Sequence, residues 1–195
     1  MKKIKEYRYI SSSTNEAGLL KKELNISNND LLKNKEVEII MNYIIRLANE
    51  NDLSGLCDIR NNKDLFTNYL KQFAKEEVYL AIAEQDSLIF GFGVLKLKGT
   101  LLPKLSDLYV KEDYRGNGIG SDLIRYRENI AKSLGHSEIF VSVDPIENPK
   151  MIKLISKHGY EPISDPYLKN AIFFNDDGTT YNKTYTRIDL KKLLN

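Results

Sequence analysis

The stretch that decides the fold reads LYVKEDYRGNGIG and occupies residues 108–120. It begins as a short strand-forming run, Leu108 to Val110, and leads into residues with helical periodicity. Gly116, Gly118 and Gly120 stand between them at every second position, where glycine lets the backbone adopt a positive φ and approach a ligand closely. A helix that begins here directs its unpaired N–H groups and its positive dipole end at the loop. The loop is therefore predicted to hold a polyphosphate.

The spacing of these glycines excludes the two common nucleotide-binding loops. A P-loop requires a Gly-Lys pair followed by Ser or Thr, and residues 108–120 contain no such pair. A dinucleotide fingerprint counted from Gly116 requires its third glycine where Ser121 stands. A glycine-rich turn without a ligand is the remaining alternative.

The sequence on both sides of the loop mixes strand and helix patterns. Two apolar runs around the polar break at residues 84–87 predict a hairpin, and a second hairpin is expected to close the chain around residues 176–178. These patterns predict an α/β (α+β) domain with a mixed sheet. Strands are expected at residues 43–48, 78–83, 88–95, 105–110, 139–143, 171–174 and 185–190, and helices at residues 51–59, 64–77, 120–134 and 149–158.

The first part of the chain has a different composition. Residues 1–40 are rich in Lys, Asn, Ser and Glu, and we interpret them as an N-terminal extension. Ser13 to Glu16 has the pattern of a helix start. Residues 41–195 are predicted to form the single domain.

Composition excludes several classes of function. The chain has 29 basic and 27 acidic residues, so its net charge of +2 gives no electrostatic case for nucleic acid or a membrane as partner. No apolar run approaches the roughly 20 residues that span a bilayer. One cysteine, Cys57, and two distant histidines, His136 and His158, predict neither a disulfide nor a metal site. A cytoplasmic location is the default expectation.

Three segments resemble the GNAT superfamily of N-acetyltransferases. Arg115 to Gly120 matches the family signature [QR]-x-x-G-x-[GA], and Leu108 to Val110 resembles the strand before it. The segment from Asn148 to Tyr160 resembles the family's later N-x-x-A-x-x-L-Y-x-K-x-G-F motif. The resemblance covers about residues 41 to 190, and it implies a mostly antiparallel central sheet flanked by helices.

The resemblance also implies a binding site for acetyl-CoA as co-substrate. Leu108 and Val110, with Tyr109 between them, would pair with the pantetheine arm, and Asn148 would contact it. GNAT enzymes usually transfer the acyl group directly to an amine. The CoA pyrophosphate would be held by the backbone N–H groups of Arg115, Gly116, Asn117, Gly118, Ile119, Gly120 and Ser121.

Proton transfer is the part of the reaction for which the chain departs from the family. A primary amine has a pKa near ~10.4, so a base or a water chain must take its proton. Asp107, just before Leu108, is the first candidate for this base, with a surface or capping aspartate as the alternative, and Glu84 is the second. Ile155 stands where the family often has a tyrosine acid, so either water or another group protonates the thiolate, or a neighbour such as Tyr160 is the acid.

The sequence leaves three interpretations of the acceptor. A small-molecule amine is the leading expectation, and a protein N-terminus or lysine is the alternative. A CoA-binding domain without catalysis is a third interpretation, which rests on Ile155. A homodimer is compatible with all three.

Overall fold

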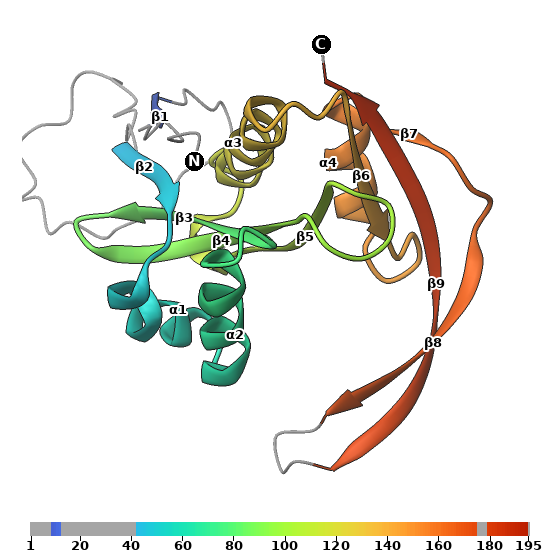
Figure 1. Cartoon of the computed structure of the whole chain (residues 1–195), viewed down its shortest axis with the longest axis horizontal. Helices are drawn as coiled ribbons and strands as arrows, with labels where there is room; N and C mark the ends of the chain where they lie inside the picture. Colours follow the sequence, from blue (N-terminus) through green and yellow to red (C-terminus); the bar gives the residue numbers. More distant parts are fainter. Residues whose placement is uncertain (1–8, 13–41, 175–178, 195) are drawn as a thin grey trace, which may run out of the picture.

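The computed structural model describes residues 9–12, 42–174 and 179–194. The helix start expected at Ser13 and the hairpin turn expected at 176–178 lie outside these ranges. Within them, no helix is long and apolar enough to cross a membrane. The described residues form one curved sheet with helices on both faces (Figure 1).

The sheet is mixed and mostly antiparallel, as predicted. Its strands follow the order β1-β2-β3-β4-β5-β6-β9-β7, with β8 paired to β9. Only β5 and β6 run parallel among the pairs of the described chain. The strands are β1 (Tyr9–Ser12), β2 (Asn42–Leu47), β3 (Val78–Gln85), β4 (Leu88–Lys96), β5 (Lys104–Val110), β6 (Glu138–Val143), β7 (Glu161–Pro162), β8 (Tyr167–Phe174) and β9 (Thr180–Leu193).

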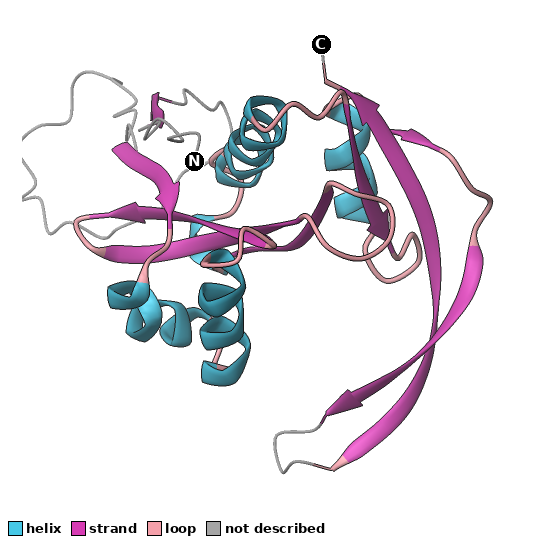
Figure 2. Cartoon of the chain, in the orientation of Figure 1, coloured by secondary structure: helices cyan, strands magenta, loops and turns pink. Residues whose placement is uncertain are grey.

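The helices lie on opposite faces of the sheet (Figure 2). On one face are α1 (Leu53–Ile59), which follows a 3₁₀ turn at Glu50–Asp52, and α2 (Lys63–Phe73). The other face carries α3 (Ile119–Ser133) and α4 (Pro149–Lys157). The Asn62 side chain starts α2 by accepting a hydrogen bond from the Leu65 N–H at 3.0 Å.

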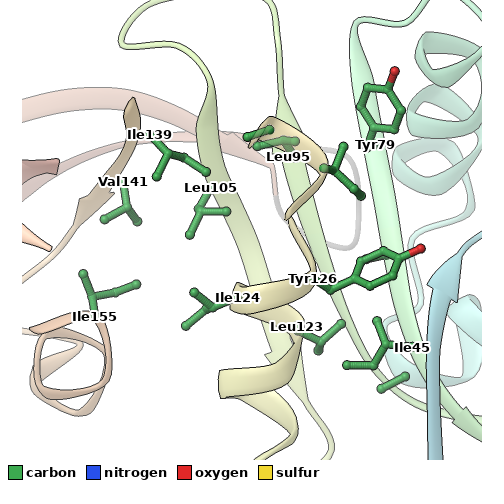
Figure 3. Packing of buried hydrophobic residues seen from close by; sticks show 14 of the residues in the cluster. Ile45, Tyr79, Leu95, Leu105, Leu123, Ile124, Tyr126, Ile139, Val141 and Ile155 are labelled. Carbon is green, nitrogen blue, oxygen red and sulfur yellow. The ribbon is translucent and has the colours of Figure 1, made fainter. Parts of the chain in front are cut away.

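Alternation along the central strands divides the core between the two faces. In β3, Tyr79 and Ala81 pack on the α3 side, whereas Leu80 and Ile82 pack on the α1 and α2 side. Because both faces are covered, the strand reads as one continuous apolar run. Figure 3 shows the α3 side, where Ile155 of α4 completes the layer.

Three boundaries differ from the sequence predictions. The second helix ends at Phe73, before Glu77, because Glu76 has a φ of 57° and stops the helix. The closing strands are longer than expected, since β8 starts at Tyr167 and β9 extends from Thr180 to Leu193. Residues 9–12 of the extension add a strand to the edge of the sheet, antiparallel to β2.

Candidate active site

A cavity opens where β5 and β6 separate. These strands pair at only two positions, Lys104 with Phe140 and Leu105 with Val141. Beyond these pairs the strands diverge toward the end of β5. The space between them forms a cavity of about 200 Å³. Its walls are made by Leu105, Ser106, Asp107, Leu108, Arg127, Val141, Ser142, Val143, Asp144, Asn148, Met151 and Arg187.

A β-bulge places Asp107 at this cavity. Ser106 pairs with Val94, and Tyr109 pairs with Phe92, so two residues of β5 stand opposite Gly93. Asp107 is one of them and has a φ of 43°, in the left-handed region that few residues other than glycine adopt. Its carboxylate accepts a hydrogen bond from the Tyr69 hydroxyl of α2. Burial, followed by the nearby charge of Asp107, raises the pKa of Tyr69, so the tyrosine stays a proton donor to the carboxylate.

Arg127 of α3 holds both sides of this bulge. Its Nη1 donates to the carbonyl oxygens of Val94 at 2.9 Å and Ser106 at 3.0 Å. The guanidinium fills the space above Gly93, where an added Cβ would lie 2.6 Å from its Cζ. Burial lowers the pKa of Arg127 to about 10, so the group remains charged at neutral pH. Its Nη2 has no hydrogen-bond partner among the described residues.

The glycine loop leaves the start of α3 uncapped. Gly116 and Gly118 have positive φ values of 85° and 79°, which the loop requires and glycine permits. Gly118 occupies the N-cap position, and no side chain caps the helix. The first helical hydrogen bond runs from the Asp122 N–H to the Gly118 carbonyl at 3.0 Å. The N–H groups of residues 119–121 precede it and therefore have no acceptor inside the helix.

Side-chain contacts fasten this loop to the sheet. The Arg115 Nε donates to the Val110 carbonyl at 2.9 Å, and its guanidinium lies 5.7 Å from the centre of the Tyr109 ring. The ring of Tyr114 stacks on Phe90 at 4.7 Å. The Arg115 N–H, one of the expected phosphate donors, already donates to Glu112 within the loop at 3.1 Å.

The other predicted residues divide into two groups. Asp107, Leu108 and Asn148 line the cavity. Tyr160 does not, because its side chain is only 2% exposed and belongs to the core beneath α3 and α4. Burial and the adjacent charge of Glu128 raise the pKa of its hydroxyl. Glu84 is also occupied elsewhere, since it accepts from the Arg46 Nε at 2.8 Å.

Two arginines of the cavity wall were missed by sequence reasoning. Arg127 falls on the apolar stripe of α3, four residues after Leu123 and three before Ile130, and this position is a signal that could have been read. Arg187 lies within the last strand, in a stretch where polar residues occupy both faces of the strand pattern. No local feature of that pattern distinguishes it from surface positions.

The chain matches one family model in comparisons with known proteins. The model of the acetyltransferase (GNAT) family matches residues 42–160. No curated protein sequence matches the chain significantly.

Solved structures share the fold at low sequence identity. An N-acetyltransferase from Staphylococcus aureus Mu50 is 18% identical, with a TM-score of 0.62 over 80% of this chain and 100% of its own. A ribosomal-protein-alanine N-acetyltransferase from Brucella melitensis is 19% identical, with a TM-score of 0.61 over 77% of this chain and 99% of its own. A putative acetyltransferase from Salmonella typhimurium, solved with its cofactor acetyl-CoA, is 14% identical, with a TM-score of 0.61 over 80% of this chain and 95% of its own.

Proposed function

Because the chain belongs to the acetyltransferase (GNAT) family, we propose that it moves an acetyl group from acetyl-CoA directly to the primary amine of a small molecule. The observation that carries this proposal is the shared position of two features. The cavity between β5 and β6 opens toward the end of β5, and the uncapped start of α3 follows that end of the strand. A long ligand with a phosphate at one end and an acyl group in the cavity matches both features.

The residues present fit CoA. The N–H groups of Gly116 to Ser121, at the positive end of the α3 dipole, would hold the pyrophosphate. The edge of β5 at Leu108 and Val110 is unpaired by β6 and would take the pantetheine arm as a strand partner. Asn148 lines the opposite wall of the cavity, where it would contact the arm.

Asp107 is the group that would take the amine proton. The acceptor nitrogen forms a bond to the acetyl carbon, the carbon–sulfur bond breaks, and the nitrogen loses a proton as the thiolate gains one. The Asp107 carboxylate lies at the cavity and is oriented by Tyr69, so it can hold the amine and accept its proton. Arg127 adds a fixed positive charge in the wall, which would stabilise negative charge that develops during transfer.

The leaving thiolate also needs a proton donor. Tyr160 lies outside the cavity wall, and Ile155, in the family's tyrosine position, is fully buried. We therefore propose that water protonates the leaving thiolate, and loss of turnover in Tyr160→Phe would contradict this.

The test is release of free thiol from acetyl-CoA with a panel of amines, including amino acids, aminosugars, polyamines and short peptides. Release that depends on a small amine supports the proposal, whereas release with peptides alone reassigns the acceptor. Tight acetyl-CoA binding by calorimetry without release by any acceptor would contradict the transferase and favour a binding domain.

A further inference from the structure

The face of the sheet that carries α1 and α2 extends beyond these helices. In Figure 1, α1 and α2 lie beneath β3 and β4, whereas β5, β6 and β9 continue past them. Asp107 also points to this face, because its carboxylate meets Tyr69 of α2. An acceptor that reaches the base would therefore approach it from this face.

Basic side chains gather on this open face. Lys104 pairs in register with Lys96 on one side and with Phe140 on the other. Phe140 in turn pairs with Lys191, and Arg187 lies four residues before Lys191 on the same face of β9. Positions far apart in the sequence thus bring Lys96, Lys104 and Arg187 together.

Three positive charges and one negative charge act on Lys104. Burial lowers the pKa of Lys104, the carboxylate of Asp189 raises it, and the positive charges of Arg187, Lys169 and Lys96 lower it further. Within the described part of the chain, no carboxylate lies within ion-pair distance of any of these four groups. The Asp189 carboxylate also accepts hydrogen bonds from the hydroxyls of Ser142 and Tyr167.

Two arginines with unmet donors line the same cavity. Arg187 lines it from β9, and its Nε is buried without a partner among the described residues. Arg127 lines the cavity from α3, and its Nη2 is also buried without a hydrogen-bond partner among the described residues. Buried donors of this kind are rare in folded proteins, and a bound acceptor group is a usual explanation for them. An anion would satisfy both the unmet donors and the excess of positive charge.

We propose that the acceptor is a small amine that also carries a carboxylate, with the carboxylate bound by Arg187 and Lys104 and the amine directed to Asp107. This inference rests on the proposed transferase and names its acceptor class. Asp107 and Arg187 line the cavity together with Arg127 and Asp144, so the site offers partners of both charges to a zwitterion such as an amino acid. The same charges disfavour polyamines, because a second ammonium group would face Lys104 and Arg187.

Matched acceptors test the charge requirement. Thiol release is measured with amino acids and with the corresponding amino acid amides, which keep the amine and lose the carboxylate. We expect kcat/KM to be about 10- to 100-fold higher for the acids, the effect of one or two charge-assisted hydrogen bonds. Equal rates for acids and amides, or a preference for polyamines, would overturn the proposal and leave the transferase intact.

Variants test the residues. Arg187→Gln and Lys104→Gln should bring the acid-to-amide ratio of kcat/KM toward one, with an unchanged KM for acetyl-CoA. Lys132→Gln is the matched control, because it removes one exposed charge from the last turn of α3 on the opposite face, and it should keep the ratio.

Two further arms identify the source and the kind of anion. Preference for succinyl-CoA over acetyl-CoA with a neutral amine would place the carboxylate on the donor and overturn the assignment to the acceptor. Preference for phosphoethanolamine over glycine would replace the carboxylate by a phosphate.

Calorimetry of amino acid binding in the presence of CoA separates this inference from the proposed function, because it needs no turnover. Binding that is lost in Arg187→Gln supports the inference. Absence of binding by every amino acid overturns it.

Discussion

Asp107 is held in its position by neighbours on both sides. The bulge gives it a left-handed backbone, Arg127 fastens the carbonyl groups around the bulge, and Tyr69 binds the carboxylate. Its place just before Leu108 made it the predicted base, and it lines the cavity. Its backbone conformation was not predictable, because the bulge depends on Arg127 and Gly93, which lie 20 residues after it and 14 residues before it in the sequence.

Replacement of the base should separate chemistry from binding. In Asp107→Asn, the amide keeps the size of the side chain and loses the ability to accept the amine proton. We expect kcat to fall by about 10²–10⁴-fold, with little change in the dissociation constant of acetyl-CoA. Thiol release and calorimetry measure the two quantities. Asp86→Asn, in the exposed turn between β3 and β4, is the control, and full activity of Asp107→Asn would dismiss this base.

Gly93 and Arg127 should be coupled energetically. A Cβ at Gly93 would overlap the guanidinium, so Gly93→Ala should lower the free energy of unfolding by roughly 1–3 kcal/mol. In the double variant with Arg127→Met, the flexible side chain leaves room for the methyl group. Denaturant unfolding of the single and double variants should give a coupling energy of about 0.5–3 kcal/mol.

The same cycle with Gly120→Ala is the control for this coupling. A Cβ at Gly120 would lie 3.6 Å from Leu154, an ordinary contact, so this substitution and Arg127→Met should be additive. If the effects of Gly93→Ala and Arg127→Met were also additive, a methyl group at residue 93 would not compete for space with the Arg127 side chain.

At the scale of elements, the central strands and the helix starts were the most predictable features. The apolar run at 78–83 and the hairpin break at 84–87 reproduce β3 and β4 closely, since both faces of these strands are buried. The helix after the glycine loop was predicted within one residue at each end. The length of β9 was underestimated, because its first half pairs only with β8 and carries little apolar burial to mark it.

The loop at the start of α3 yields a prediction with a matched control in the same helix. Gly118 precedes the helix and Gly135 follows it, and both have positive φ, 79° and 92°. Valine at either position should cost about 1–2 kcal/mol of backbone strain. Only Gly118→Val should also raise the dissociation constant of acetyl-CoA, by tenfold or more, because the side chain obstructs the phosphate site.

Calorimetry on both folded variants checks this difference. Unchanged affinity in Gly118→Val would remove the loop from the CoA site. An equal loss of affinity in Gly135→Val would attribute the effect to general destabilisation of α3.

For the whole molecule, the sequence predicted the architecture and could not predict the basic cluster. Hydrophobic periodicity and the glycine motif are local, and they indicated the mixed sheet and the CoA loop. Lys96 and Lys104 are partners on β4 and β5, and Arg187 comes near them because the sheet order places β9 next to β6, which pairs with β5. No pattern within one segment carries that information.

Acetyl-CoA should stabilise the folded chain measurably, because its proposed site is built from both sides of the β5–β6 opening. At a free concentration of 100 times its dissociation constant, the gain is about 2.7 kcal/mol. For a domain of this size, that gain corresponds to a rise in Tm of roughly 5–10 °C. Thermal unfolding with and without acetyl-CoA measures the shift. The Gly118→Val variant should show a smaller rise in Tm. An equal rise in the wild-type protein and the variant would place the ligand elsewhere.

The brief contact between β5 and β6 also has a consequence for cooperativity. Besides the pairing at Lys104 and Leu105, one further backbone bond, from the Phe140 N–H to the Pro103 carbonyl at 2.9 Å, joins these strands. The sheet therefore consists of two hydrogen-bonded groups of strands, β1 to β5 and β6 to β9, which are joined by a short contact between β5 and β6. Such units can open separately, and amide hydrogen exchange would then show two groups of rates. A pantetheine arm of CoA bound between β5 and β6 would extend the contact between the two groups of strands. The two groups of exchange rates would then merge into one.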